Sequence, residues 1–97
     1  MSSQNIEKRG DHTITFKVLD MPEELYQRII DLAVFALEKF NVEREMASQL
    51  QRDLNREFGQ TWHVIVGKNF GFYGTHESQR FCYFTIGAIQ FLCFKSR

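Results

Sequence analysis

The sequence predicts an α+β domain in which two N-terminal helices pack against an antiparallel β-sheet. Two observations support this class. Apolar residues recur at helical spacing between residues 20 and 58, and from residue 61 onward the apolar period changes to two. A chain of 97 residues is expected to form a single domain.

The chain is expected to open with a flexible, polar extension over residues 1–13, followed by the packed domain over residues 14–97. Residues 14–18 alternate and predict a short first strand. Asp20 offers a helix cap, and Pro22 is tolerated in a first helical turn. The apolar residues of the first predicted helix are Leu25, Ile29, Leu32, Ala33, Ala36, Leu37 and Phe40.

A second helix is predicted from Glu43 to Phe58. Asn41 is suited both to end the first helix and to cap the second, and Gly59 is suited to a left-handed residue after the helix. A narrow apolar stripe covers one surface and leaves the other faces in water. This stripe consists of Met46, Leu50, Leu54 and Phe58.

Four strand-like stretches follow. Residues 62–66 alternate, whereas residues 70–75 are interrupted by Gly71 and Gly74. Strands with interior glycines are weakly registered and open to pairing with another backbone. Residues 81–86 and 89–94 then predict a hairpin around Gly87 and Ala88.

The two hairpin strands are apolar on both faces. Phe81 and Tyr83 share one face, while Phe84 and Ile86 share the other. An antiparallel sheet with one face in water would alternate more cleanly between apolar and polar residues. Two helices can cover only one face of the sheet. We therefore expect a homodimer in which two sheets pack face to face with the helices outside.

Composition excludes several function classes. The formal net charge is zero, which argues against nucleic-acid binding because that requires a concentrated basic face. No apolar run approaches the length of a membrane span, and the N-terminus lacks the apolar segment of a signal peptide. Cys82 and Cys93 lack metal-ligand spacing. They are expected to be buried, reduced thiols in a cytosolic protein without metal or cofactor.

Signals for catalysis are weak. Thr75, His76 and Glu77 are neighbours, but adjacent residues of an extended segment point to opposite sides and cannot form a relay with one another. Gly67 and Lys68 do not complete a phosphate-binding loop, because Asn69 follows where Ser or Thr is needed. We expect a binding protein rather than an enzyme, with a small enzyme or regulator using His76 as the alternative.

Four segments resemble the small dynein light chain family: WHVIVGKNFG at residues 62–71, THE at 75–77, FCYFTIG at 81–87 and FLCFKS at 91–96. The resemblance extends over about residues 14–96. It implies a homodimer in which a short strand, here residues 72–75, crosses over and completes the sheet of the partner. It also implies that extended segments of disordered proteins bind by β-strand addition.

The resemblance also implies functional residues. Glu43 and Arg44 match an acid–base pair that holds a target glutamine, and His63 and Tyr73 match positions at the dimer interface. The implied peptide-binding groove comprises Glu43, Arg44, Asn69, Phe70, Gly71, Phe72, Tyr73, Gly74, Thr75, His76, Phe81, Tyr83 and Leu92. Departures from the usual family pattern at Phe72, Gly74, Thr85 and Gln90 predict a changed target preference.

The resemblance thus predicts a non-catalytic, dimeric light chain of a dynein motor complex, without cofactors, that binds intermediate chains. A dynein-independent dimerisation hub for cytosolic proteins is the alternative, and the second protomer is an identical chain or a paralogue. The expected location is the cytoplasm and cytoskeleton. The helix start at residues 20–24 and the Gly-Phe pair at residues 71–72 resemble axonemal family members, which function in cilia.

Overall fold

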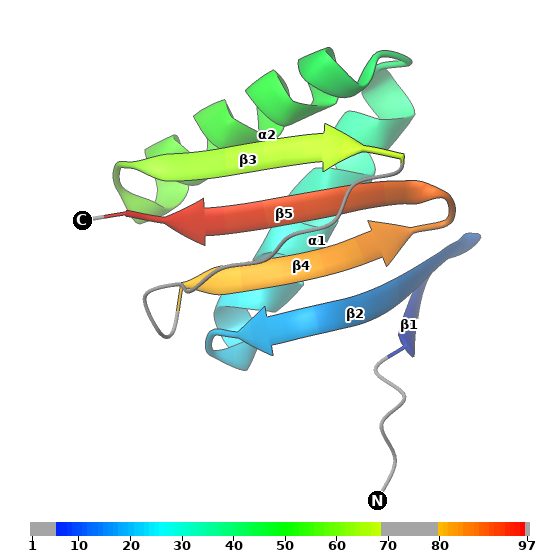
Figure 1. Cartoon of the computed structure of the whole chain (residues 1–97), viewed down its shortest axis with the longest axis horizontal. Helices are drawn as coiled ribbons and strands as arrows, with labels where there is room; N and C mark the ends of the chain where they lie inside the picture. The colour runs from blue at the N-terminus through cyan, green and yellow to red at the C-terminus, as the bar shows by residue number, and fades with distance from the viewer. Residues whose placement is uncertain (1–5, 69–79, 97) are drawn as a thin grey trace, which may run out of the picture.

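The computed structural model describes residues 6–68 and 80–96 of the chain, which fold into two helices and a five-stranded sheet (Figure 1). All strand pairs are antiparallel, and the strand order is β1-β2-β4-β5-β3. The α+β class is therefore confirmed. The elements in chain order are β1 (Ile6–Arg9), β2 (His12–Asp20), α1 (Glu23–Lys39), α2 (Glu43–Phe58), β3 (Trp62–Gly67), β4 (Phe81–Ile86) and β5 (Ile89–Lys95).

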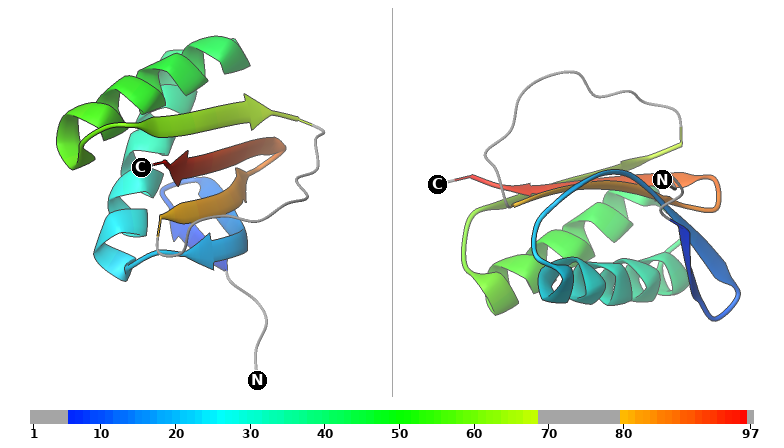
Figure 2. Two further views of the ribbon diagram at one scale, coloured as in Figure 1. Left: turned by 60° about the vertical axis from the view of Figure 1, so that its left-hand side comes forward. Right: turned by 90° about the horizontal axis from the view of Figure 1, so that it is seen from below.

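Both helices cover the same face of the sheet, as Figure 2 shows. The core lies between the two layers, where residues of alternate strand positions meet the apolar stripes of the helices. Trp62, Phe84 and Phe91 are its largest fully buried side chains. The remaining buried members are Ile14, Phe16, Ile29, Ile30, Leu32, Ala33, Leu50, Leu54, Cys82, Ile86 and Cys93.

The helix bounds agree with the sequence pattern, but the caps differ from it. Neither N-terminal cap makes a side-chain hydrogen bond: Pro22 precedes α1, and Val42 rather than Asn41 precedes α2. The predicted cap Asp20 instead ends strand β2. Gly59 follows α2 with φ +80°, a backbone angle that favours glycine. Over the described ranges, neither helix combines the length and apolar character needed to cross a membrane.

The N-terminal part of the sheet corrects the predicted first strand. Strand β2 extends from His12 to Asp20 rather than over residues 14–18, and its register with β4 shifts between Phe16 and Val18. Strand β1 pairs with it through a tight turn at Gly10, where φ is +61°. Regular structure thus begins before residue 14, although the flexibility expected for residues 1–13 stays a prediction.

The C-terminal hairpin is confirmed. Strands β4 and β5 pair without a register shift from Phe81 opposite Phe94 to Ile86 opposite Ile89. Gly87 occupies the turn with φ +60°, which an L-residue with a side chain rarely adopts. Its N–H donates to the carbonyl oxygen of Thr13 at 3.2 Å, so the turn is also joined to β2.

Candidate functional site

The sheet face opposite the helices carries a row of rings across three strands. His63 of β3 stacks on Phe94 of β5 with ring centroids 5.0 Å apart, and Phe94 stacks on Phe81 of β4 at 6.2 Å. These residues are also directly paired in the strand register. The imidazole Nε2 of His63 lies 3.1 Å from the Ser96 hydroxyl. The row lies on the face that the helices leave uncovered, and its member Phe81 is itself buried.

This second face is largely apolar, as the sequence predicted. In the register, Tyr83 lies opposite Leu92, which lies opposite Ile65 on β3. Leu92 is only 1% exposed, whereas Ile65 is 48% exposed. This face thus combines buried and half-exposed apolar side chains.

Strand β3 is an edge strand whose outward backbone groups can be identified. The N–H of Ser96 donates to the carbonyl of Thr61 at 2.9 Å, so Thr61 faces β5. Because an antiparallel ladder alternates, His63 and Ile65 also direct their backbone groups toward β5, whereas Val64 and Val66 direct theirs outward. Strand β3 pairs only with β5 within the described residues.

Helix α2 limits this open edge at one end. The backbone of Trp62 also points outward, but the side chains of α2 satisfy it. Its N–H donates to Asn55 Oδ1 at 2.8 Å, and its carbonyl accepts from Gln51 Nε2 at 2.9 Å. Neither amide contact was predicted from the sequence, where the spacing of four on the polar side of a helix was the available signal. The open stretch therefore covers Val64 and Val66.

The N-terminus of α2 carries two residues that the family resemblance assigns to the peptide-binding groove. Glu43 is half-buried and Arg44 is exposed, and both belong to the first turn. The helical ladder begins with the N–H groups of Glu45 and Met46, which donate to the carbonyl of Val42. The N–H groups of Glu43 and Arg44 precede this ladder and so have no acceptor within the helix. Helix α2 runs alongside β3 in the opposite direction (Figure 1).

The structure brings part of the predicted site together. Phe81, Tyr83, Leu92 and His63 share the uncovered sheet face. Glu43 and Arg44 lie in the helix layer instead. The other predicted residues lie outside the described part of the chain, and they are Asn69, Phe70, Gly71, Phe72, Tyr73, Gly74, Thr75 and His76.

The two cysteines lie away from this face and are structural. Cys82 and Cys93 are direct cross-strand neighbours on the helix-covered face, both fully buried and both free thiols. Desolvation raises the pKa of both thiols, and the neighbouring Cys93 raises that of Cys82 further. Among the residues placed by the structure, no group of three His, Cys, Asp or Glu side chains is arranged to hold a metal ion.

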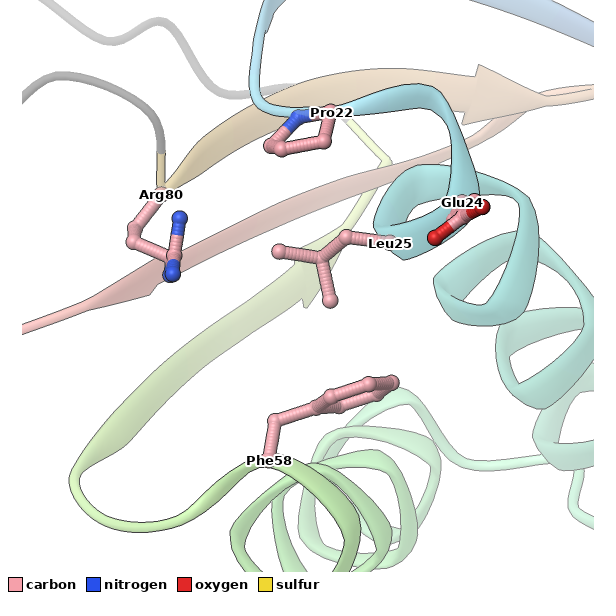
Figure 3. A pocket seen from close by; sticks show the side chains of 5 residues that line it. All are labelled: Pro22, Glu24, Leu25, Phe58 and Arg80. Atoms are coloured by element: carbon pink, nitrogen blue, oxygen red, sulfur yellow. The ribbon is translucent and has the colours of Figure 1, made fainter.

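A separate pocket of about 290 Å³ lies where α1 begins, α2 ends and β4 begins (Figure 3). Leu25 and Phe58 form its apolar wall, while Pro22, Glu24 and Arg80 complete the lining. Of the predicted groove residues that the structure describes, none lines this pocket. The candidate site is therefore the uncovered face together with the β3 edge.

Two helices on one face of an antiparallel sheet, with an open edge beside an uncovered apolar face, define a dynein light chain-like domain. Residues 13–96 match the family described as dynein light chain type 1. This match covers most of the chain, and the chain belongs to that family.

Solved structures show the same fold. The dynein light chain-like domain of the Fasciola hepatica calcium binding protein FhCaBP2 superposes with a TM-score of 0.76 at 14% identity, covering 94% of this chain and 98% of that chain. A mercury derivative of the same domain gives a TM-score of 0.74 at 15% identity, covering 93% and 96%. At these identities the likeness establishes the fold alone.

Proposed function

We propose that this protein is a non-catalytic, dimeric light chain of a dynein motor complex that binds extended protein segments by β-strand addition. The observation that carries this proposal is the edge of β3. It is regular, contains no Asp, Glu, Lys or Arg, and directs the backbone groups of Val64 and Val66 outward next to an apolar sheet face. An edge of this kind is a template for another strand.

The strand that occupies this edge is proposed to come from the partner protomer. Residues 72–75 would cross over and extend the partner's sheet next to β3, and a target segment would then add to residues 72–76. Phe81, Tyr83 and Leu92 lie on the sheet face that would form the groove floor. The N-terminal turn of α2, with Glu43 and Arg44, would receive a target amide.

Target preference is proposed to differ from that of the common family members. Thr85 and Gln90, two of the residues that depart from the family pattern, are direct cross-strand neighbours on the uncovered face. A change at both positions alters one connected part of this surface. The other two departures, Phe72 and Gly74, fall in the segment proposed to pair with targets.

Dynein intermediate chains are the proposed targets. A dimer with two identical grooves holds two copies of a disordered segment, and the second binding event gains from a high effective concentration. The second protomer is proposed to be an identical chain, with a paralogue as the alternative. The proposed location is the cytoplasm and cytoskeleton, including the axoneme of cilia.

A dynein-independent hub for diverse cytosolic partners is the second candidate. An affinity purification with the tagged chain separates the two. Enrichment of axonemal intermediate chains supports the motor subunit, whereas a broad set of partners without dynein supports the hub. Catalytic turnover that depended on His76, with peptide binding retained in His76→Ala, would contradict both.

The dimer itself is tested by substitution on the uncovered face. Ile65→Glu places an unpaired carboxylate at the proposed sheet-to-sheet interface, and such burial costs about 3 kcal/mol, or roughly a hundredfold in dimer affinity. Sedimentation equilibrium measures the change. Phe35→Glu is the matched control, because Phe35 is equally exposed at 49% but lies on α1, outside the sheet. Equal dimer affinity in both variants would contradict the proposed interface.

A further inference from the structure

The two edges of the sheet differ in whether they are already occupied. On the β2 side of the sheet, opposite to β3, the carbonyl of Thr13 faces β4. It accepts a hydrogen bond there from the N–H of Gly87. The alternation of the ladder then directs the backbone groups of His12 and Ile14 outward. Strand β1 covers them, with Arg9 opposite His12 and Glu7 opposite Ile14. An edge equivalent to that of β3 is thus filled by the chain itself.

Side-chain contacts from α1 hold β1 in this position. The carboxylate of Glu7 accepts two bonds from the Gln27 amide at 3.0 and 3.1 Å. The guanidinium of Arg9 lies 3.2 Å from Asp31. At the start of β2, His12 Nε2 lies 2.9 Å from Glu38. The hairpin therefore lies along one side of α1, as Figure 2 shows.

Strand β1 and the rest of β2 resist further pairing. Strand β1 has only four residues, three of them charged. Beyond it, the register of β2 with β4 shifts between Phe16 and Val18, which leaves Lys17 exposed at an irregularity. Short length, charge and bulges are the features by which natural sheets blunt an edge. Strand β3 has none of these features.

We propose that strand β1 acts as an intramolecular ligand that closes the β2 edge, so that strand addition is confined to the β3 edge. This rests on the proposed function, and it assigns a role to a segment that precedes the matched family region at residue 13. Without β1, the outward groups of His12 and Ile14 would accept a strand from another copy of this chain. Each dimer would then have additional sites and would grow into larger assemblies.

The test uses two proline variants of the full chain. Glu7→Pro removes an N–H that points toward β2 and also removes the bonds from Gln27. Lys8→Pro is the matched control, because the N–H of Lys8 points outward and an edge strand tolerates proline there. Circular dichroism checks that both variants retain their helices. Hydrogen exchange at Ile14, whose N–H points toward β1, reports pairing of the hairpin, and sedimentation reports the assembly mass.

The Ile14 amide is expected to exchange about tenfold or more faster in Glu7→Pro than in the wild type, with assemblies heavier than the wild type at high protein concentration. Lys8→Pro should match the wild type in both measurements. Faster exchange with an unchanged mass would overturn the proposal. If the exchange rate does not rise in Glu7→Pro, the double variant Arg9→Glu/Gln27→Glu is used instead. Its new carboxylates repel Asp31 and Glu7 and open the hairpin. An unchanged assembly mass in that variant would likewise overturn the proposal.

The proposed function and the closed edge fail in different ways. A wild-type chain that remains monomeric and binds no extended segment contradicts strand addition at β3. Growth of assemblies in Glu7→Pro is measured without any target segment, so it tests the β2 edge independently.

Discussion

At the scale of single residues, Cys82 and Cys93 make stability depend on alkaline pH. Burial raises the pKa of both thiols in the folded protein. The unfolded thiols ionise near about 8.5, and a group whose folded pKa is raised loses its stabilising contribution as pH rises above the unfolded value. Each thiol should thus reduce the free energy of unfolding by about 1.4 kcal/mol per pH unit above that value.

Urea unfolding, from neutral pH to pH values above the pKa of the unfolded thiols, measures this dependence. The double variant Cys82→Ala/Cys93→Ala should be less stable at neutral pH because it leaves small cavities, but it should show a shallower alkaline slope. The difference in slope isolates the thiols from tyrosines and lysines, which titrate in both proteins. Identical slopes would show that the thiols are accessible to ionisation in the folded state.

The residue types predicted which sheet face each side chain occupies, but they did not predict the polar contacts between elements. Alternation placed Phe81, Tyr83 and Leu92 on one face, since strand geometry fixes which side each residue takes. The contacts of Gln51 and Asn55 with Trp62 were not predicted, because they join a helix to a strand whose relative position depends on the whole core. The same holds for Asp53, which is buried at 3% exposure beside Gln49 and Arg56.

At the scale of elements, a bidentate ion pair joins the two helices. The guanidinium of Arg28 on α1 donates to both carboxylate oxygens of Glu57 on α2 at 2.8 and 2.7 Å. This hydrogen bonding lowers the pKa of Glu57 and raises that of Arg28. Both side chains are partly exposed, so the pair is expected to contribute only about 0.5 kcal/mol.

Glu57→Gln tests this pair. Because the pKa of Glu57 is lowered in the folded state, its contribution is present above the unfolded value of about 4.3 and is lost as pH falls through the lower folded value. The variant should therefore be less stable than the wild type at neutral pH and nearly equal to it in acid. Thermal unfolding in low salt measures both. A stability gap that persisted in acid would assign the loss to packing instead.

Element prediction succeeded where one pattern dominates a segment and failed at strand β1. The bounds of α2 and the β4–β5 hairpin follow from strong periodicity and from glycines at the ends. The β1 segment, Ile-Glu-Lys-Arg, has no apolar face of its own. It is held as a strand because α1 offers Gln27 and Asp31 as partners, which no local pattern reveals.

At the scale of the whole molecule, the described helices and strand β1 leave one sheet face and one sheet edge without a covering element from among them. The helices cover the face that carries Trp62 and Phe84, and β1 occupies the edge of β2. This leaves the ring-bearing face and the β3 edge for a second protomer. The sequence predicted the face from its apolar strands, but the choice of edge required the strand order.

Residue-resolved hydrogen exchange in β3 tests this account most directly. The Trp62 amide bonds to Asn55 within one protomer, and the Ile65 amide points toward β5, so both should be protected in any folded chain. The amides of Val64 and Val66 point outward and require a second strand. We predict that they are protected like Ile65 at concentrations where the chain is dimeric and lose protection on dilution. Rapid exchange of Val64 and Val66 at every concentration, with Trp62 and Ile65 protected, would contradict strand addition at this edge.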